Sequence, residues 1–566
     1  MNRETAFFQH SVAVAAQFLQ TAVVIDDRAF DVEDEPELEG EIVAPPTPTT
    51  AEPRGPEPAL TPTPSTRSTE VAADPEPDRL DPKPVIDGFA SHGIVCSVLH
   101  REPNDRLVPP RNRLSRLADV ADILVIDWQI HRSEGESAEE TLELLETAVR
   151  QNVEETPRKL RLIAVYTGEI DLLGVAERIQ ERLEARLRPE PVQLDGPFAF
   201  RTGAVRIVVL GKKTVAGRTP EAKSQEVDFD ELASRTITEF ACMTAGLVSN
   251  VALTALTRIR LDTHRILDRF SPRIDAAFLV HRALLESQQE ADEHLAPIIA
   301  AELQAIIQEP GTHISDDEIS EWLIARQMRH STHTEWGFAA PENEQKLLLQ
   351  LCTRGCEALA ADELPKELRS LKEISPPRGC AALDRLVEFI GGPVFPDANE
   401  ELAMLMGLNT RYSAEPPHLT LGTVMLLDQA CGKSFWLCLQ PSCDSVRLKR
   451  PRDFPLLRLS QSNDKFGIVV RVGTDFVRLR IDPRPFKLQT VSFKPDKSKD
   501  LVLATTDEEG RHWFQSRDET RRYQWIGELK FEHAQRAVQA FASQNSRVGL
   551  TESEWQRRRD LGRGDG

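Results

Sequence analysis

The chain of 566 residues lacks an apolar run as long as the roughly 18 residues that a membrane-spanning helix requires. Its amino-terminal segment, residues 7–14, is interrupted by Gln9, His10 and Ser11, which is typical of an amphipathic helix and not of a signal peptide. We therefore expect a soluble, cytoplasmic protein without a membrane partner.

The eight cysteines are scattered, and no two of them form a Cys-x-x-Cys pair. A structural zinc site needs closer pairs with histidine partners, so we expect free thiols in a reducing compartment. The chain also lacks the phosphate-binding loop of nucleotide hydrolases, the Gly-x-Ser-x-Gly elbow, the His-Glu-x-x-His motif and the protein-kinase signatures. We expect no enzyme activity beyond phosphotransfer. The alternative for the carboxyl-terminal half is a nucleophilic thiol at Cys443, which follows an apolar strand.

Acidic residues outnumber basic residues by 90 to 69, and one segment concentrates this excess. Residues 31–84 hold fourteen acids, four bases and thirteen of the 38 prolines. Such a composition buries too little apolar area to offset the entropy lost on ordering, so we predict a disordered, extended insertion. Its acidity argues against nucleic acid as a partner of this half of the chain.

Four short apolar segments are each followed by a carboxylate, hydroxyl or ammonium side chain. These residues are, in chain order, Asp26 and Asp27, then Asp127, then Thr167, then Lys212 with Lys213 beside it. In an open parallel sheet the carboxyl ends of the strands lie along one edge, where ligands bind. Carboxylates, a hydroxyl and a lysine at one edge are the groups that hold a divalent cation and a phosphoryl group.

This order of residues resembles the receiver domain of two-component response regulators over residues 1–215. The resemblance implies a doubly wound, flavodoxin-like α/β domain in which Asp127 is the phospho-acceptor that becomes an aspartylphosphate. It further implies that Thr167 is the switch hydroxyl and Lys212 the conserved lysine. That lysine usually precedes a proline in this family, whereas Lys213 follows here, so either lysine could point inward; we favour Lys212 because it comes first after the strand.

The resemblance also implies a cofactor and a partner. The cofactor is Mg²⁺, with Asp26, Asp27, Asp127 and a carbonyl at Gln129 as its ligands, which suits a cation that prefers oxygen. The expected partner is a cognate histidine kinase. The insertion 31–84 directly follows the strand that ends at Asp27, so it sits beside this site either as a lid or as a passive insertion.

Beyond the receiver, we predict an α-helical domain over residues 225–410 and a β-rich domain with a carboxyl-terminal helix over 411–550. Residues 275–282 are apolar almost all round, which predicts a helix buried in a bundle. The candidate strands of the β-rich domain are 420–427, 435–439, 468–472, 476–481 and 501–504.

Residues 444–500 carry fourteen bases against seven acids, in contrast to the acidic chain around them. A basic surface attracts nucleic acid or an acidic protein surface. Aromatic residues are few in this segment, which weakens a base-stacking interpretation, so we do not expect nucleic acid as a partner. Docking of the acidic insertion or of a partner protein is the alternative.

A receiver that carries a Pro-rich insertion and no familiar DNA-binding module resembles the receiver proteins of Detocs, a phosphorelay-type antiphage defence system. This resemblance implies a kinase that phosphorylates two receivers, of which one bears a toxic effector and the other serves as a phosphate buffer. Because the chain shows no effector signature, it is more similar to the buffer protein, with an effector-bearing receiver protein as a second partner. The alternative is a phosphorylation-switched effector whose carboxyl-terminal half is an unrecognised enzyme or binds nucleic acid.

Overall fold

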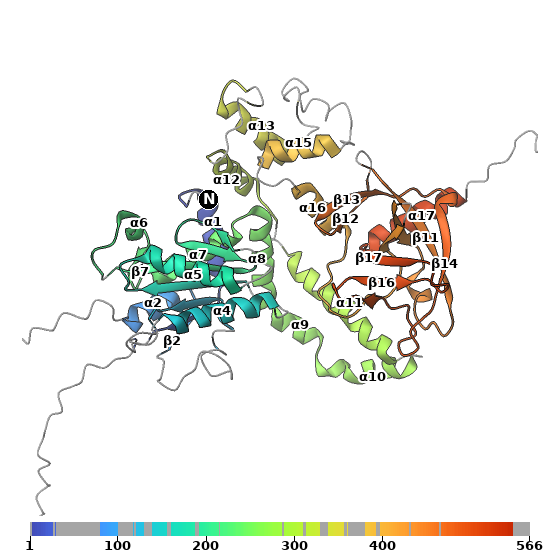
Figure 1. Ribbon diagram of the computed structural model, residues 1–566, viewed down its shortest axis with the longest axis horizontal. Helices are drawn as coiled ribbons and strands as arrows, with labels where there is room; N and C mark the ends of the chain where they lie inside the picture. The colour runs from blue at the N-terminus through green and yellow to red at the C-terminus, as the bar shows by residue number, and fades with distance from the viewer. Residues whose placement is uncertain are drawn as a thin grey trace, which may run out of the picture. The chain divides into compact units, whose positions relative to one another are not determined.

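The computed structural model in Figure 1 describes residues 3–26, 29, 80–99, 117, 120–129, 138–154, 160–186, 192–213, 215–285, 288–309, 313–328, 335, 338–355, 359, 380–391, 397–429, 432–462 and 466–546. Asp27 and residues 31–79 of the predicted insertion lie outside these ranges. The prediction that the disordered insertion extends to residue 84 is wrong for its last residues, because Leu80 is buried in a core and a helix begins at Pro82. The chain divides into two compact units, Met1–Ala325 and Arg326–Gly566.

The first unit is built on a sheet with the strand order β2-β1-β3-β4-β7-β6-β5, with β8 beside β7. Strands β2, β1, β3, β4 and β7 run parallel, and the β5–β6 hairpin adds an antiparallel edge. This arrangement confirms the predicted parallel-rich α/β sheet. The strands are β1 (Thr21–Ile25), β2 (Val95–Leu99), β3 (Ile123–Ile126), β4 (Arg161–Thr167), β5 (Gln193–Leu194), β6 (Ala199–Thr202), β7 (Val205–Lys212) and β8 (Glu226–Val227).

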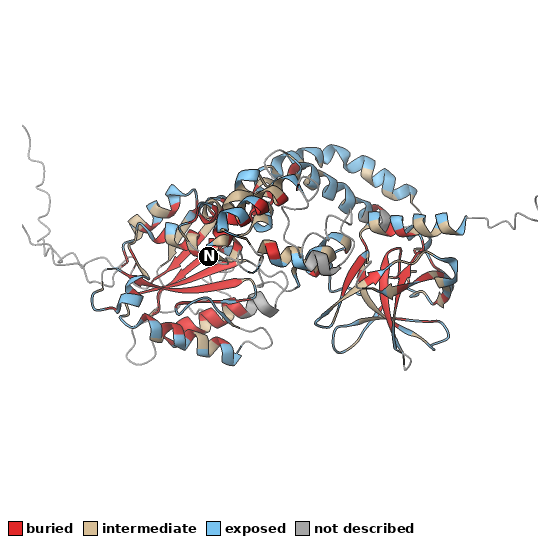
Figure 2. Ribbon diagram, turned by 90° about the horizontal axis from the view of Figure 1, so that it is seen from above, coloured by how far each residue is buried: buried red, intermediate tan, exposed pale blue. Residues whose placement is uncertain are grey.

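Helices cover both faces of this sheet, and its central strands are buried between them (Figure 2). Alternate residues of a strand face opposite sides, so Leu124 contributes to one core and Val125 to the other. Helices α4 and α5 close the first core, and α1, α2 and α7 close the second. The helices are α1 (Ala6–Phe18), α2 (Pro82–Ser91), α4 (Glu139–Glu154), α5 (Leu172–Arg186), α6 (Pro220–Lys223) and α7 (Leu232–Thr244).

Helix α7 belongs to the core of the receiver sheet, although its sequence lies inside the predicted helical domain 225–410. Its residues Leu232, Ile237 and Phe240 are buried together with the β1 and β4 side chains on that face. The sheet face needs an apolar cover, and α7 supplies it. A helical domain spanning all of 225–410 stays a prediction.

Of the remaining helices of the first unit, those within residues 263–307 are largely exposed along their length. The prediction that 275–282 forms a buried helix is wrong, because α10 has no buried residue and Leu279 is 60% exposed. A helix that is apolar on all sides is buried only if other elements surround it. The main described contacts of α10 are with α11 and a preceding 3₁₀ turn, which leave most of its surface uncovered. The remaining helices of this unit are α8 (Leu247–Leu261), α9 (Thr263–Arg269), α10 (Asp275–Leu284), α11 (Gln288–Ile307) and α12 (Asp316–Gln327), which extends across the boundary.

The second unit confirms the predicted β-rich region with an antiparallel sheet in the order β12-β13-β11-β10-β9-β17-β16-β15, with β14 beside β11. Its strands are β9 (Thr423–Gln429), β10 (Gly432–Cys438), β11 (Arg452–Gln461), β12 (Ile468–Val472), β13 (Asp475–Arg480), β14 (Leu488–Phe493), β15 (Thr505–Thr506), β16 (His512–Gln515) and β17 (Arg522–Glu528). Its helices are α13 (Pro341–Arg354), α15 (Cys380–Gly391), α16 (Ala398–Gly407) and α17 (Phe531–Asn545).

Several features of this sheet differ from the sequence prediction, which did not include β14, β15, β16 or β17. Residues 501–504 form no strand and contribute only an isolated bridge between His418 and Leu503. The central strand β11 was not predicted, because Pro455 and alternating charges interrupt its pattern.

In the described part of the chain, no single helix is long and apolar enough to cross a membrane, although the pair α7 and α8, bent by 119°, would suffice in length and composition.

Candidate functional site

The residues predicted from the strand ends meet at one edge of the receiver sheet. Asp26 directly follows β1, and Asp127 directly follows β3. These strands pair in parallel with Ile25 opposite Ile126, so the two carboxylates leave the sheet side by side. Thr167 ends β4 opposite Gly211, and Lys212 ends β7.

Lys212 is the centre of this edge. Its side chain is fully buried, and its ammonium donates to Asp127 Oδ2 at 2.6 Å and to Asp26 Oδ2 at 3.1 Å. Both carboxylates are themselves at least 95% buried, so the cation offsets charge that water does not reach. Charge-assisted hydrogen bonds of this kind are short and directional.

The structure distinguishes the two lysines that the sequence left open. Lys213 points to the surface, where it pairs with Asp228, and its side chain is 53% exposed. That ion pair raises the pKa of Lys213. Of the two, Lys212 is therefore the lysine that the fold brings to Asp127.

Thr167 and Gln129 are joined at this edge through Glu169. The Gln129 backbone N–H donates to Asp127 Oδ1 at 3.2 Å, and its side-chain amide donates to the Glu169 carboxylate. The Glu169 backbone N–H in turn donates to the buried Thr167 hydroxyl at 3.1 Å. Hydrogen bonds through Gln129 and Glu169 therefore connect Asp127 to Thr167. Glu169 was not predicted from the sequence.

Arg218 is a second residue that sequence reasoning missed. Its fully buried guanidinium donates to the backbone carbonyl oxygens of Lys212 at 2.6 Å, Thr167 at 3.1 Å and Glu169 at 2.9 Å. It also approaches the Glu226 carboxylate at 3.4 Å. Arg218 therefore ties the ends of β4 and β7 together. No signal in the sequence marks it, because it stands in a loop six residues after Lys212.

Gly211 leaves the space that Arg218 occupies. A β-carbon at Gly211 would lie 2.6 Å from Arg218 Nη1 and 2.7 Å from Arg218 Cζ, well inside van der Waals contact. The glycine is thus required by a close approach of a side chain and not by a left-handed backbone. Because Gly211 immediately precedes Lys212, this packing fixes the backbone from which the lysine extends.

The site has donors that suit a hard cation. Asp26 and Asp127 supply carboxylate oxygens at one edge, and Mg²⁺ binds one or two carboxylates while keeping several waters. Across the described residues, no group of three or more His, Cys, Asp or Glu side chains is placed to hold a metal, and Asp27 lies outside them. Asp26, Asp127 and the neighbouring Gln129 backbone are the described groups that fit the ion.

The thiols differ in their surroundings. The five cysteines whose side chains the structure describes are free thiols. Burial raises the pKa of Cys438 to about 12, which keeps it as a thiol at neutral pH. Cys443, the candidate nucleophile, is exposed in a 3₁₀ turn at Ser442–Asp444, and no hydrogen bond joins it to a described histidine.

Comparisons with known proteins agree with this geometry. Residues 18–217 match the model of a family described as the response receiver domain, which supports the predicted receiver domain. The matched range begins just before β1 and ends just before Arg218, so it includes Asp26, Asp127, Thr167 and Lys212. No curated protein and no solved structure matches the chain.

Proposed function

We propose that the protein accepts a phosphoryl group on Asp127 from a cognate histidine kinase. A lone pair of an Asp127 carboxylate oxygen forms the new O–P bond, while the N–P bond of the donor phosphohistidine breaks and its electrons return to the imidazole. The observation that carries this proposal is the buried Lys212 ammonium, 2.6 Å from Asp127 and within hydrogen-bond distance of Asp26.

The other residues at the edge take supporting roles in this reaction. Lys212 leaves its bond to Asp127 Oδ2 and pairs with a phosphoryl oxygen, which it reaches as a point charge. The Thr167 hydroxyl oxygen accepts from the Glu169 N–H and its proton is left to donate to a phosphoryl oxygen. Asp26, Asp27 and Asp127 would hold Mg²⁺, and the ion would supply positive charge that offsets the charge on the phosphoryl oxygens.

Phosphorylation by a small donor tests this assignment without the kinase. Acetyl phosphate and Mg²⁺ should add the mass of one phosphoryl group to the protein, and Asp127→Ala should abolish this addition. Asp171→Ala is the matched control, because Asp171 is an exposed carboxylate that caps α5 through the Gly174 N–H. An unchanged mass shift in Asp127→Ala would refute the assignment.

The same proposal extends to the role in the cell, which is that of a phosphate buffer in a bacterial antiphage phosphorelay. Its support is a receiver site joined to a β-rich unit in which the sequence shows no catalytic motif. Such a buffer draws phosphoryl groups away from a second, effector-bearing receiver protein. Its loss raises the output of the system.

Co-expression separates the buffer from a phosphorylation-switched effector. With the kinase and the partner receiver present, Asp127→Ala should slow growth without infection if the protein is a buffer. An effector behaves in the opposite way, because an effector that cannot be phosphorylated stays silent. Normal growth together with lost phage protection would overturn the buffer role and favour the effector.

A further inference from the structure

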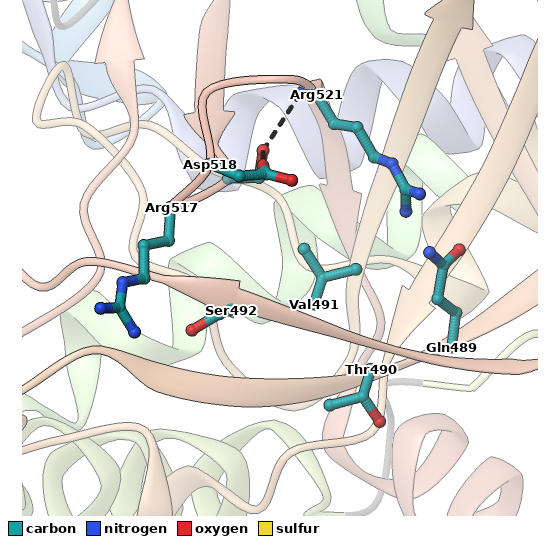
Figure 3. Close-up of a pocket in the computed structure, with 8 residues that line it drawn as sticks. Gln489, Thr490, Val491, Ser492, Arg517, Asp518 and Arg521 are labelled. Atoms are coloured by element: carbon teal, nitrogen blue, oxygen red, sulfur yellow. Dashed lines mark hydrogen bonds between the residues drawn. The ribbon is translucent and has the colours of Figure 1, made fainter.

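The β-rich unit contains a cavity of about 390 Å³, remote from Asp127 in the sequence, that the receiver chemistry does not use. It lies between β14 and the turn that joins β16 to β17 (Figure 3). Its volume is within the range of about 300–1,000 Å³ typical of ligand sites. The lining residues are Gln489, Thr490, Val491, Ser492, Ser516, Arg517, Asp518 and Arg521.

Pro455 determines which way the backbone of β14 faces. Pro455 of β11 pairs with Thr490 and has no N–H to donate, and its carbonyl oxygen accepts from the Leu439 N–H on the other side at 2.9 Å. The pair Pro455–Thr490 is therefore a non-hydrogen-bonded pair of the antiparallel ladder. Consequently the N–H and C=O of Thr490 point away from β11, toward the outer edge of β14.

That outer edge is closed at one end only. The Ser492 carbonyl oxygen accepts from the Arg517 N–H at 2.8 Å, and Phe493 forms an isolated bridge with Ser516. Next along the edge, the backbone groups of Thr490 have no hydrogen-bond partner among the described residues. An unpaired strand edge of this kind is a template for one more strand.

The turn beside this edge presents two arginine side chains. Arg517 and Arg521 have no carboxylate within ion-pair distance in the described part of the chain, and the Arg521 guanidinium lies near the Gln489 amide (Figure 3). Asp518 also lines the cavity and its carboxylate accepts from the hydroxyls of Ser516 and Thr520 within the turn, so it offsets one of the two positive charges and the lining keeps a net charge of +1. These hydrogen bonds lower the pKa of Asp518.

We propose that this cavity binds an acidic peptide segment in extended conformation, which adds a strand to the open edge of β14. The backbone of the peptide pairs with the N–H and C=O of Thr490, and its carboxylate side chains meet Arg517 and Arg521. Backbone pairing supplies affinity in such a complex, and the side-chain contacts supply selectivity. This inference goes beyond phosphoryl acceptance at Asp127 and does not depend on it.

Two features favour a peptide over nucleic acid. A free backbone donor and acceptor on one strand edge match the alternating groups of another strand and not a phosphate backbone. The eight lining residues also include no aromatic side chain on which a base could stack.

Binding can be measured with the full chain and a fluorescein-labelled hexapeptide that alternates valine with glutamate. Fluorescence anisotropy should show saturable binding, and a peptide with lysine in place of glutamate should bind at least about tenfold more weakly. A third peptide, N-methylated at alternate amides, keeps the carboxylates but blocks the strand edge. It should also lose about tenfold.

Variants of the protein locate the site. Arg517→Gln and Arg521→Gln should each weaken binding of the glutamate peptide by about tenfold. Arg480→Gln is the control with the same loss of charge, since Arg480 is exposed on β13 and does not line the cavity; it should change affinity less than about twofold. Circular dichroism of each variant verifies the fold.

Four results with the peptides and variants would each overturn the proposal. They are the absence of saturable binding up to millimolar peptide, equal binding of the lysine peptide, equal binding of the N-methylated peptide, and equal losses in the Arg480 control. Tighter binding of an oligothymidylate that competes with the peptide at Arg517 and Arg521 would also overturn it, in favour of single-stranded nucleic acid.

Discussion

At the scale of single residues, the receiver edge depends on one buried cation between two buried carboxylates. The Lys212 ammonium donates to both Asp26 and Asp127. Removing one partner of a buried ion pair is costly because the charges left behind are neither solvated nor paired. If the proposed Mg²⁺ binds to the same carboxylates, it should compensate their charge as Lys212 does, and this can be tested.

Lys212→Ala should destabilise the protein by about 3–5 kcal/mol without Mg²⁺, because the buried carboxylates of Asp26 and Asp127 then repel each other without the ammonium that bonds to both. Millimolar Mg²⁺ should restore much of this loss, so the rise in melting temperature on adding Mg²⁺ should be larger in Lys212→Ala than in the wild type. Differential scanning fluorimetry measures it, with Lys213→Ala as the control for an exposed lysine. The same Mg²⁺-induced rise in all three proteins would contradict the prediction.

Gly211 and Arg218 should behave as a coupled pair. Gly211→Ala alone should cost about 1–3 kcal/mol, because the new β-carbon overlaps the buried guanidinium. In an Arg218→Ala background the overlap with the guanidinium is gone and only Leu172 Cδ1, 3.0 Å from the new β-carbon, must give way, so the same change should cost less than in the wild type. A double-mutant cycle by urea unfolding measures the coupling, and additive losses would show that the two residues do not restrict each other.

The residues of the site were predictable to different extents. Asp26, Asp127, Thr167 and Lys212 stand at strand ends, where a run of apolar residues indicates the strand and parallel pairing brings its end to the common edge. Arg218 follows no strand and acts through backbone carbonyl groups, which every residue carries. Loops have no periodicity that would indicate the direction of a side chain, so contacts of this kind require the structure.

At the scale of elements, helix α7 shows how a charged residue holds a helix on a sheet. Glu239 of α7 is buried and pairs with Arg206 of β7, Arg235 of its own helix and Arg3 near the amino terminus. Burial opposes its ionisation, but the three guanidinium groups prevail and lower the pKa of Glu239. The helix itself was predictable from its apolar pattern, whereas its partner was not, because an amphipathic face does not specify which surface it covers.

The lowered pKa of Glu239 predicts a loss of stability in acid. A carboxyl whose pKa is lower in the folded protein than in the unfolded chain contributes stability above its unfolded pKa of 4.5, and this contribution disappears as the pH falls through the folded value. Glu239→Gln should cost about 3–5 kcal/mol at pH 7 and flatten the decline of stability below pH 4.5. Urea unfolding between pH 7 and pH 3 tests this, with exposed Glu231→Gln as control. Parallel acid profiles would contradict it.

Strand β11 illustrates the limit of pattern reading for sheets. Pro455 argues against a central strand, because proline removes a donor from the ladder. In the structure the lost donor costs nothing, since Pro455 faces Thr490 in a non-hydrogen-bonded pair and its carbonyl oxygen bonds to Leu439. The register of partner strands, which lie far away in sequence, decides whether a proline is tolerated.

At the scale of the whole molecule, the question is where the receiver ends as a folding unit. The sequence places its end at residue 215, and the family match ends at residue 217. Packing gives a later end, because α7 lies in the same core as β1 and β4. Boundaries drawn from motifs follow the functional residues, whereas a stable fold also requires the helix that covers the second face of the sheet.

A fragment of residues 1–246 should therefore fold and accept a phosphoryl group from acetyl phosphate, whereas a fragment of residues 1–225 should be much less stable. The shorter fragment exposes the sheet surface that Leu232, Ile237 and Phe240 bury in the longer one. Each such side chain contributes about 1.5–3 kcal/mol on burial, and three of them approach the total of about 5–15 kcal/mol that stabilises a typical domain. Urea unfolding of the two fragments measures the difference. If residues 1–225 unfold at the same urea concentration as residues 1–246, the receiver ends before α7 and the helix is only an addition to a domain already complete.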